Sequence, residues 1–414
     1  MQTLNTKSAV FTEQMKQTHT ILVPNMLPIQ LKLMIAILEN YGYKMELLET
    51  EGPSIVEYGL KNVHNDTCYP ALLVIGQLID ALHSGKYDLN KVALILPQTG
   101  GGCRASNYIH LMRKALKNNG LEHIPVISLN TMGLESSPGF KITPQMMYQI
   151  LYALILGDLI MHLYHQTRPY EVQTGASQKA VDNCISVISK EFNGRTAFGS
   201  RLMDKLYDRV IGEFSAIKLT GESKVKVGIV GEIYVKFSPL GNNNLEEFLL
   251  SENAEVVMPG LLDFCLYCIY GDIQDRRLYG RSLKAAVASK AIYKFILSKQ
   301  RRVLEKLKGH PRFRNMTDFE ETRRGVKPYI NLGAQMGEGW LLTGEMVELA
   351  HSGVRNIICT QPFGCLPNHI VGKGMIRQIK EKNPGVNIIS IDYDPGASRI
   401  NQENRIKLML AAAK

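Results

Sequence analysis

Cysteine is the residue type with the most distinctive chemistry in this sequence. The seven cysteines are Cys68, Cys103, Cys184, Cys265, Cys268, Cys359 and Cys365. Thiolates are soft ligands that suit iron–sulfur clusters, and zinc also accepts them. Structural zinc usually needs two compact Cys-x-x-Cys pairs, and this chain has one, so zinc is the less favoured metal. A cysteine is also often a small buried hydrophobe, and we expect that role for Cys184, which falls in the middle of a predicted helix.

Two segments of the chain repeat one layout around a cysteine. Leu96 to Cys103 reads LPQTGGGC, and Ile358 to Cys365 reads ICTQPFGC. Each is a predicted strand end, a polar turn, and then a glycine followed by a cysteine. The glycines allow close approach of the backbone, and their N–H groups are suited to bind cluster sulfide. The predicted cofactor-binding glycines are Gly100, Gly101, Gly102 and Gly364.

Each half also has an earlier cysteine near the start of an upstream helix. In the first half it is Cys68, and in the second half it is Cys265 or Cys268. Helix starts stabilise the negative charge of a cluster. If the two halves face one another, six thiols converge on one cleft, although Cys265 and Cys268 share a helical face and one of them can point away. The six predicted ligands are Cys68, Cys103, Cys265, Cys268, Cys359 and Cys365.

The pattern of apolar residues places these turns in an α/β fold. Apolar runs alternate with amphipathic segments, which predicts parallel strands joined by right-handed helical crossovers in both halves. The predicted strands cover 20–24, 44–48, 92–96, 124–129, 225–230, 256–258, 356–359 and 386–391, and the helices between them include 29–41, 70–82, 107–117, 144–164, 245–251, 264–309, 340–351 and 368–382. Ligands of such sheets bind at the carboxyl ends of the strands, where both glycine–cysteine turns fall.

The length of 414 residues suits two or three domains. We expect a first α/β domain over residues 1–165, a helical connector over 166–222 and a second α/β domain over 223–414. The start of the chain lacks a signal-peptide layout, so we expect a cytoplasmic protein whose thiols stay reduced, without a disulfide framework. The apolar stretch 146–163 contains Gln149, Gly157 and Asp158, which favours a buried helix over a membrane span.

The composition limits the possible partners. The chain has 48 Lys and Arg against 38 Asp and Glu, a net charge of +10, with 45% hydrophobic residues. No basic run is interleaved with aromatic residues, which argues against nucleic-acid binding. An acidic protein or a phosphate-rich substrate fits the excess charge better. The basic segment Tyr279–Gly309 is a candidate docking surface, or simply a solvated helical face.

Six stretches carry a resemblance to a known family. They are His64–Ala71, Gln98–Asn107 and Pro125–Asn130 in the first half, and Gly228–Tyr234, Cys359–His369 and Ile391–Gly396 in the second. On these stretches the chain resembles the 2-hydroxyacyl-CoA dehydratase superfamily, most closely the branch related to dehydratase activators and double-cubane cluster proteins. The resemblance runs across nearly the whole chain.

The resemblance implies two Rossmann-like domains with an oxygen-sensitive iron–sulfur cluster in the cleft between them, in a homodimer. It implies an [8Fe–9S] double cubane held by the six cysteines given above, or a [4Fe–4S] cluster held by three cysteines in the dehydratase branch. It also implies a partner, an ATP-dependent reductase or activator with its own iron–sulfur cluster. This chain has no Gly-rich loop followed by Lys-Ser/Thr, so we expect the ATP chemistry to belong to that partner.

The predicted function is therefore that of an iron–sulfur oxidoreductase, which receives electrons from a partner ATPase and reduces a small substrate. A 2-hydroxyacyl-CoA dehydratase component and a non-catalytic electron carrier are the alternatives. Glu232 is a candidate proton donor, or a structural residue at the start of the next element. Gln98 and His369 are candidate catalytic groups near the cluster, and they are equally suited to cap helices or turns. The same choice holds for Thr99, Arg104, Asn107, Gln361 and Asn368.

Overall fold

The computed structural model describes residues 8–64, 66–99, 101–130, 135, 137–193 and 199–413. Gly100, one of the predicted cofactor-binding glycines, lies outside this range. The chain divides into two compact units, residues 1–150 and 151–414. Residues 166–222, the expected connector, fall within the second unit, and the division near residue 150 differs from the expected boundary at 165.

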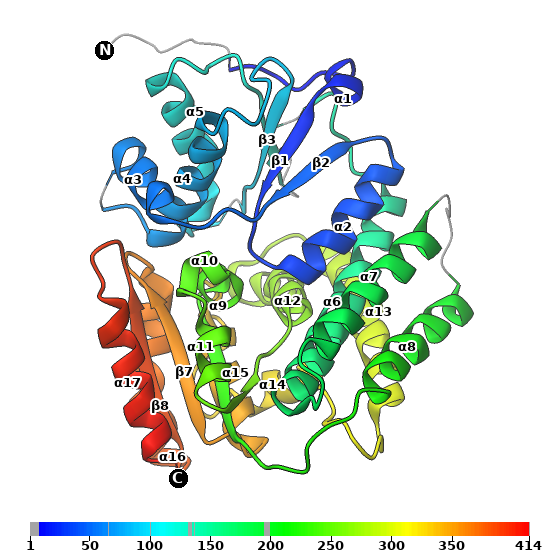
Figure 1. Cartoon of the computed structure of the whole chain (residues 1–414), viewed down its shortest axis with the longest axis vertical. Coiled ribbons are helices and arrows are strands. Elements are labelled where there is room, and N and C mark those ends of the chain that lie inside the picture. Colours follow the sequence, from blue (N-terminus) through cyan, green and yellow to red (C-terminus); the bar gives the residue numbers. More distant parts are fainter. Residues whose placement is uncertain are drawn as a thin grey trace. The chain divides into compact units, whose positions relative to one another are not determined.

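Unit 1 is built on a four-stranded, all-parallel sheet with the order β2-β1-β3-β4 (Figure 1). In β1 Thr20 lies opposite both Lys44 of β2 and Val92 of β3, so β1 is an inner strand. The apolar run of β3 is buried on both faces, as expected for a parallel sheet. The strands are β1 Thr20–Pro24, β2 Lys44–Leu48, β3 Val92–Pro97 and β4 Val126–Leu129.

Helices α3 and α4, which connect β2 to β3 along the chain, pack closely against one another. A Cβ atom on Gly76 would lie 2.1 Å from the Ile55 carbonyl oxygen, and one on Gly59 would lie 2.5 Å from that of Leu72. The glycines therefore let α3 and α4 approach one another backbone to backbone. The helices are α1 Met15–Thr18, α2 Pro28–Asn40, α3 Pro53–Asn62, α4 Tyr69–His83, η1 Arg104–Asn107 and α5 Tyr108–Asn118, and α6 Pro144–Thr167 continues into unit 2.

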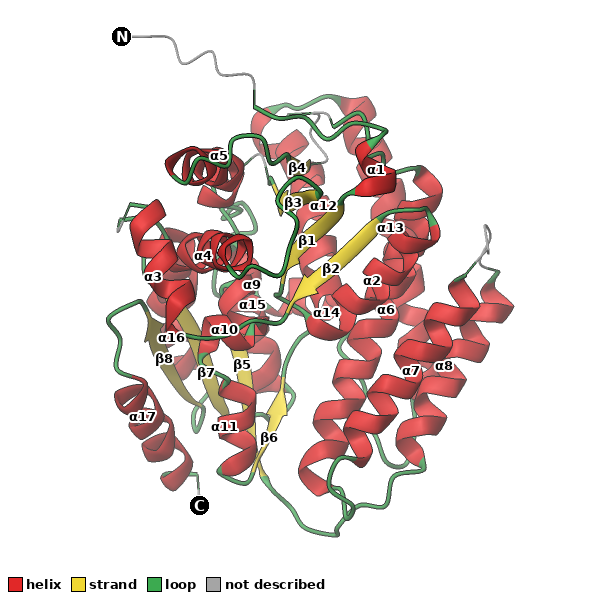
Figure 2. Cartoon of the chain, turned by 45° about the horizontal axis from the view of Figure 1, so that its top comes forward, coloured by secondary structure: helices red, strands yellow, loops and turns green. Residues whose placement is uncertain are grey.

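Unit 2 contains a second four-stranded, all-parallel sheet, with the order β6-β5-β7-β8 (Figure 2). In both sheets the first strand along the chain pairs with the second and the third, so the two units share one strand order. The predicted α/β class with parallel strands in both halves is confirmed. The strands are β5 Val225–Gly231, β6 Ala254–Val257, β7 Asn356–Pro362 and β8 Asn387–Tyr393.

The long connection from β6 to β7 holds an aromatic cluster around Trp340. Trp340 is fully buried, and its ring centroid lies 5.3 Å from that of Tyr267 and 5.8 Å from that of Phe319. These contacts fix α15 against α12 and α14. The helices of unit 2 are η2 Arg168–Tyr170, α7 Ala176–Phe192, α8 Ser200–Ser215, α9 Ile233–Phe237, α10 Pro239–Asn242, α11 Leu245–Ser251, α12 Leu261–Tyr279, α13 Leu283–Leu307, α14 Phe319–Gly325, α15 Trp340–His351, the π-helical η3 Asn368–Gly372, η4 Lys373–Met375, α16 Ile376–Lys382 and α17 Arg399–Ala411.

Helix α6 is the longest apolar element of the chain. By length and composition it could cross a membrane, but 72% of its most apolar window is buried inside the protein. Its first turn contributes Met146 to the core of unit 1, beside Phe11 and Ile127. This burial agrees with the prediction of a core helix for 146–163.

Candidate functional site

In each sheet the connections leave the first and third strands in opposite directions, so the carboxyl ends of these strands form a topological switch point. Ligands of open parallel sheets bind at such points. In unit 1 the switch point lies beyond Pro24 and Pro97, and in unit 2 beyond Gly231 and Pro362. Both glycine–cysteine turns follow the third strand directly, as the sequence predicted.

Cys68 and Cys103 lie on two adjoining turns of unit 1. Cys68 immediately precedes α4 and Cys103 immediately precedes η1, and both residues have extended backbone. The Arg104 guanidinium donates a hydrogen bond to the Asp66 carbonyl oxygen, which ties the two turns together. Cys68 is buried, with its Sγ atom 3.1 Å from Tyr108 Oη, whereas Cys103 is half-buried. This edge therefore holds two thiols at the starts of helical segments.

Gln98 connects the Cys103 turn to the neighbouring strand through hydrogen bonds. Its Oε1 atom accepts a hydrogen bond from Ser128 Oγ at 2.8 Å, and its Nε2 atom donates to the Ser106 carbonyl oxygen at 3.2 Å. Ser106 Oγ in turn donates to the Gly101 carbonyl oxygen at 2.9 Å. Gln98 thus joins β3, β4 and the turn, which gives this predicted catalytic residue a positioning role.

The glycine backbone before Cys103 borders open space. A Cβ atom on Gly101 would meet nothing within 4 Å, and Gly101 and Gly102 are both exposed. No neighbouring chain atom therefore requires glycine at position 101.

Cys365 occupies the corresponding turn of unit 2. Gly364, the residue before it, adopts φ 74°, a left-handed conformation that favours glycine. Leu366, the residue after Cys365, begins a helical segment. Cys365 itself is 9% exposed. It is surrounded along the chain by exposed apolar side chains, which are Phe363, Leu366 and Ile370. His369, a predicted catalytic residue, is exposed on the same segment.

The loop before α15 contacts three segments: the helix that carries Cys268, the segment that follows Cys365, and the first residue of α9 near the carboxyl end of β5. Tyr267 Oη donates a hydrogen bond to the Gly337 carbonyl oxygen at 3.0 Å, which holds α12 and its exposed Cys268 against the loop. A Cβ atom on Gly337 would lie 3.1 Å from Pro367 Cγ, in the segment that follows Cys365. The Glu338 carboxylate accepts a hydrogen bond from the Ile233 amide at 2.9 Å. Unit 2 therefore gathers two cysteine-bearing segments around one loop.

Cys359 does not lie at a strand end, contrary to the prediction. Strand β7 continues to Pro362, so Cys359 is an interior residue that pairs with Val230 and Ser390. It is fully buried in the hydrophobic core beneath the sheet, and burial raises the pKa of its thiol to about 12. Its Sγ atom lies 3.5 Å from Asn368 Oδ1. These contacts are those of a structural core thiol.

Two further cysteines lie on helices. Cys184 of α7 is 1% exposed, and burial raises its pKa to about 12, which agrees with the expected core role. Cys265 of α12 is half-buried, one turn before Cys268, and burial likewise raises its pKa to about 12. Among the described residues no group of three or more Cys, His, Asp or Glu is arranged to hold a metal ion. Within unit 1, Cys68 and Cys103 each precede a helical segment, and within unit 2, Cys365 precedes one and Cys268 lies on α12, whereas Cys359 lies inside β7.

Two carboxyl groups lie at the carboxyl end of β5. Glu232 caps α9, because its Oε2 atom accepts a hydrogen bond from the Val235 amide at 2.9 Å. This establishes the structural role that the sequence offered for Glu232. Desolvation, together with the charge of nearby Glu338, raises the pKa of Glu232, and desolvation also raises the pKa of Glu338. Both carboxyl groups are therefore harder to ionise than they would be in water.

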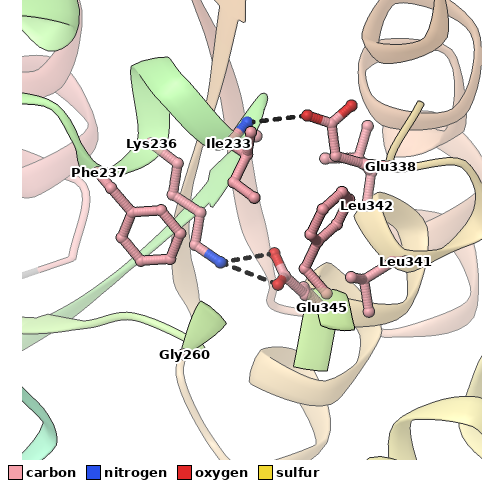
Figure 3. A pocket seen from close by; sticks show the side chains of 10 residues that line it. Ile233, Lys236, Phe237, Gly260, Glu338, Leu341, Leu342 and Glu345 are labelled. Carbon is pink, nitrogen blue, oxygen red and sulfur yellow. Dashed lines mark hydrogen bonds and ion pairs between the residues drawn. The ribbon is translucent and has the colours of Figure 1, made fainter. Parts of the chain in front are cut away.

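A buried ion pair lies next to these carboxyl groups (Figure 3). Lys236 Nζ lies 2.9 Å and 3.0 Å from the two carboxylate oxygens of Glu345, and both side chains are almost fully buried. They line a cavity with Glu338 and Gly260 that has room for roughly one water molecule. Lys236, Glu338 and Glu345 were not singled out from the sequence, where they read as ordinary helical charges. Only the glycines that flank Glu338 hinted at a special position.

Comparison of the sequence with models of known protein families gives no match, and comparison with curated proteins gives none either. The function is therefore argued from the geometry of the two sheet edges.

Proposed function

We propose that this protein is the iron–sulfur cluster-bearing component of an ATP-dependent reductase system, which accepts low-potential electrons from a partner ATPase and reduces a small substrate. The observation that supports this most is the repeated position of Cys103 and Cys365. Each follows the third strand of a parallel sheet and immediately precedes a helical segment. Each is accompanied in its own unit by a second thiol, Cys68 or Cys268.

Cys68, Cys103, Cys268 and Cys365 are the first candidates for ligands. Helix starts at Cys68 and Cys103 favour thiolates through the partial positive charge of the first backbone N–H groups. Cys265, one turn from Cys268, is the next candidate. Ligation by Cys359 would need the core around β7 to open.

The cluster, when bound, supplies one-electron redox chemistry at low potential. The residues of the chain supply the ligands, the hydrogen bonds and the protons. Reduction of a substrate also consumes protons, and Glu232 and Glu338 at the carboxyl end of β5 are the candidate donors. Gln98 and Ser106 keep the Cys103 turn in its extended conformation.

Anaerobic purification followed by iron and acid-labile sulfide analysis tests the proposal. About eight irons per chain indicate the [8Fe–9S] double cubane, and about four indicate a [4Fe–4S] cluster. We expect Cys103→Ser and Cys365→Ser to lose most of the iron. Cys184→Ser is the matched control, because Cys184 is a core thiol of α7, and it should keep the full content. An iron-free wild-type protein, or equal iron in all variants, would refute the proposal.

Turnover experiments separate the proposed enzyme from its alternatives. The holoprotein is mixed with the partner ATPase and ATP, and the electrons accepted are compared with the substrate reduced. Electron uptake without any product would indicate an electron carrier. Dehydration of a 2-hydroxyacyl-CoA with catalytic rather than stoichiometric electron uptake would indicate a dehydratase component.

A further inference from the structure

The first half of α13 presents an apolar ridge to solvent. Leu283, Val287, Ala291 and Phe295 follow one another at intervals of four residues, so they form a continuous row along one side of the helix. Leu283 is 63% exposed, Val287 60% and Phe295 42%, and Ala291 is also exposed. We call this row the outer ridge of α13. Neighbouring exposed apolar side chains of this kind mark interaction surfaces when they form a contiguous patch.

The outer ridge does not belong to the core of unit 2. The same helix buries a different side, with Tyr293, Ile296 and Leu297 packed inward. Tyr293 contacts Tyr270 of α12 and Phe319 of α14 at ring-centroid distances of 5.7 Å and 6.1 Å. The helix is therefore anchored by one face, and the ridge is a spare apolar row on the opposite side. A row at i+4 spacing is the kind that packs into the groove of another helix.

Positive charge flanks the outer ridge on both sides. Lys284, Lys290 and Lys294 are exposed, and no acidic residue occurs between Leu283 and Leu304. Among the described residues, none of these three lysines has an ion-pair partner. The surface therefore offers three uncompensated cations around an apolar centre.

The nearby acidic residues pair with an arginine rather than with the lysines of α13. At the end of α12, Asp272 and Asp275 share Arg281 at 3.4 Å and 3.2 Å. Neither aspartate forms an ion pair with Lys284, Lys290 or Lys294 among the described residues. The electrostatic complement of this surface is a helix with carboxylates on both sides of an apolar row.

We propose that the outer ridge of α13 and its lysines dock an acidic amphipathic helix of the protein that delivers electrons. This rests on the proposed function for the identity of the partner, whereas the ridge and its charge do not depend on it. A second copy of the chain is disfavoured as the occupant, because two such surfaces would bring their lysines together. An anionic membrane is disfavoured because lysines interrupt the exposed apolar side chains, whereas surface-lying helices insert a broad apolar face.

The test compares two triple charge reversals in the anaerobic holoprotein. K284E/K290E/K294E changes the docking surface, and K179E/K190E/K205E makes the same charge change on exposed lysines of α7 and α8. The rate of ATP-dependent reduction by the partner ATPase is measured over a range of salt concentrations. Reduction by dithionite, which needs no docking, is measured in parallel. A third variant, L283S/V287S, removes the apolar part of the ridge without changing its charge.

We expect the α13 charge reversal to slow ATP-dependent reduction at least tenfold at low salt, with dithionite reduction and iron content unchanged. L283S/V287S should weaken docking without changing the salt dependence, and the α7–α8 control should behave as wild type. Equal rates in all proteins would overturn the docking inference while leaving the proposed function intact. An iron-free wild type would instead overturn the proposed function. The docking inference would then be tested by sedimentation of the apoprotein with the same ATPase: equal binding by wild type and the α13 charge reversal would overturn it. Loss of self-association in the α13 variant, or binding of wild type to phosphatidylserine vesicles alone, would also overturn the inference.

Discussion

At the scale of single residues, the buried Lys236–Glu345 pair is a costly feature of unit 2. Moving two charges out of water costs several kcal/mol per ion before their attraction is counted. Here one buried lysine faces Glu345, with Glu338 on the same cavity. Such a pair is retained where it holds a geometry in place, and in this chain it holds α9 against α15 directly below the carboxyl end of β5.

We predict that Lys236→Met destabilises the protein by about 3 kcal/mol, because Glu345 is left buried without its partner. The double variant K236M/E345L should recover most of this loss, since both charges are then absent. Urea unfolding followed by the fluorescence of Trp340 measures both effects. A double variant as unstable as the single one would show that the pair itself is not the cause.

His162 gives the chain an acid-sensitive position. Its Nε2 atom donates to the Arg314 carbonyl oxygen at 2.7 Å, and desolvation lowers its pKa to about 4. The unfolded chain binds a proton on this histidine below pH ~6.5, and the folded chain does so only near pH 4. Stability from this group is therefore complete above pH ~6.5 and is lost as the pH falls toward 4.

We predict that His162→Gln reduces this loss, because glutamine keeps an N–H donor for the Arg314 carbonyl and does not titrate. Titration of one histidine can lower the free energy of unfolding by at most about 1.4 kcal/mol per pH unit. Because the side chain is partly exposed, we expect wild type to lose about 1 kcal/mol more than the variant between pH 6.5 and 5. Urea midpoints of wild type and variant at the two pH values provide the measurement. Parallel losses in both proteins would contradict the assignment.

The cysteines show what sequence can and cannot predict at this scale. Cys103 and Cys365 were placed correctly after their strands, because a glycine turn before a helix is a local signal. Cys359 was misplaced, because Thr360-Gln361-Pro362 reads as a polar turn. In the structure these residues extend β7, with Thr360 paired to Ile391 and Pro362 to Tyr393 of β8. The partner strand, which is distant in sequence, decided where β7 ends.

At the scale of elements, the contact between α3 and α4 positions Cys68. Gly76 of α4 lies against the backbone of α3 at Ile55, so a side chain has no room there.

We predict that Gly76→Ala destabilises unit 1 by about 2–3 kcal/mol through overpacking. Gly212→Ala in α8 is the matched control: nothing lies within 4 Å of the added methyl group, and alanine there should stabilise by about 0.5–1 kcal/mol. Far-UV circular dichroism during urea unfolding compares the two, and equal effects would contradict the close packing.

Most strands were predictable to within a few residues, and some helices were not. Strands β1 and β2 match their predictions, since short apolar runs between turns specify them locally. Helix α3 was missed, because its glycine at position 59 reads as a helix breaker until α4 is seen to need it. The segment 264–309, predicted as largely helical, consists of two helices that divide at Gly280, whose φ of 68° ends α12. Exposure of the outer ridge of α13 could not be predicted, because it depends on which side the core occupies.

At the scale of the whole molecule, the chain consists of two units with one strand order, each with its own core. The only tryptophan, Trp340, lies in unit 2 and is fully buried. We predict that urea unfolding followed by tryptophan fluorescence and by far-UV circular dichroism gives transitions that do not coincide, because circular dichroism reports on both units. Superimposable curves would show that the two units unfold as one cooperative body.

The position of Trp340 has a further, optical consequence. Its indole ring packs edge-on against Tyr267, which stands on α12 between Cys265 and Cys268. Iron–sulfur clusters absorb broadly in the range where tryptophan emits, so a cluster at this helix would quench the indole by energy transfer. If the proposed cluster binds at α12, the emission of Trp340 should therefore increase when the cluster is lost, which gives a label-free measure of cluster occupancy.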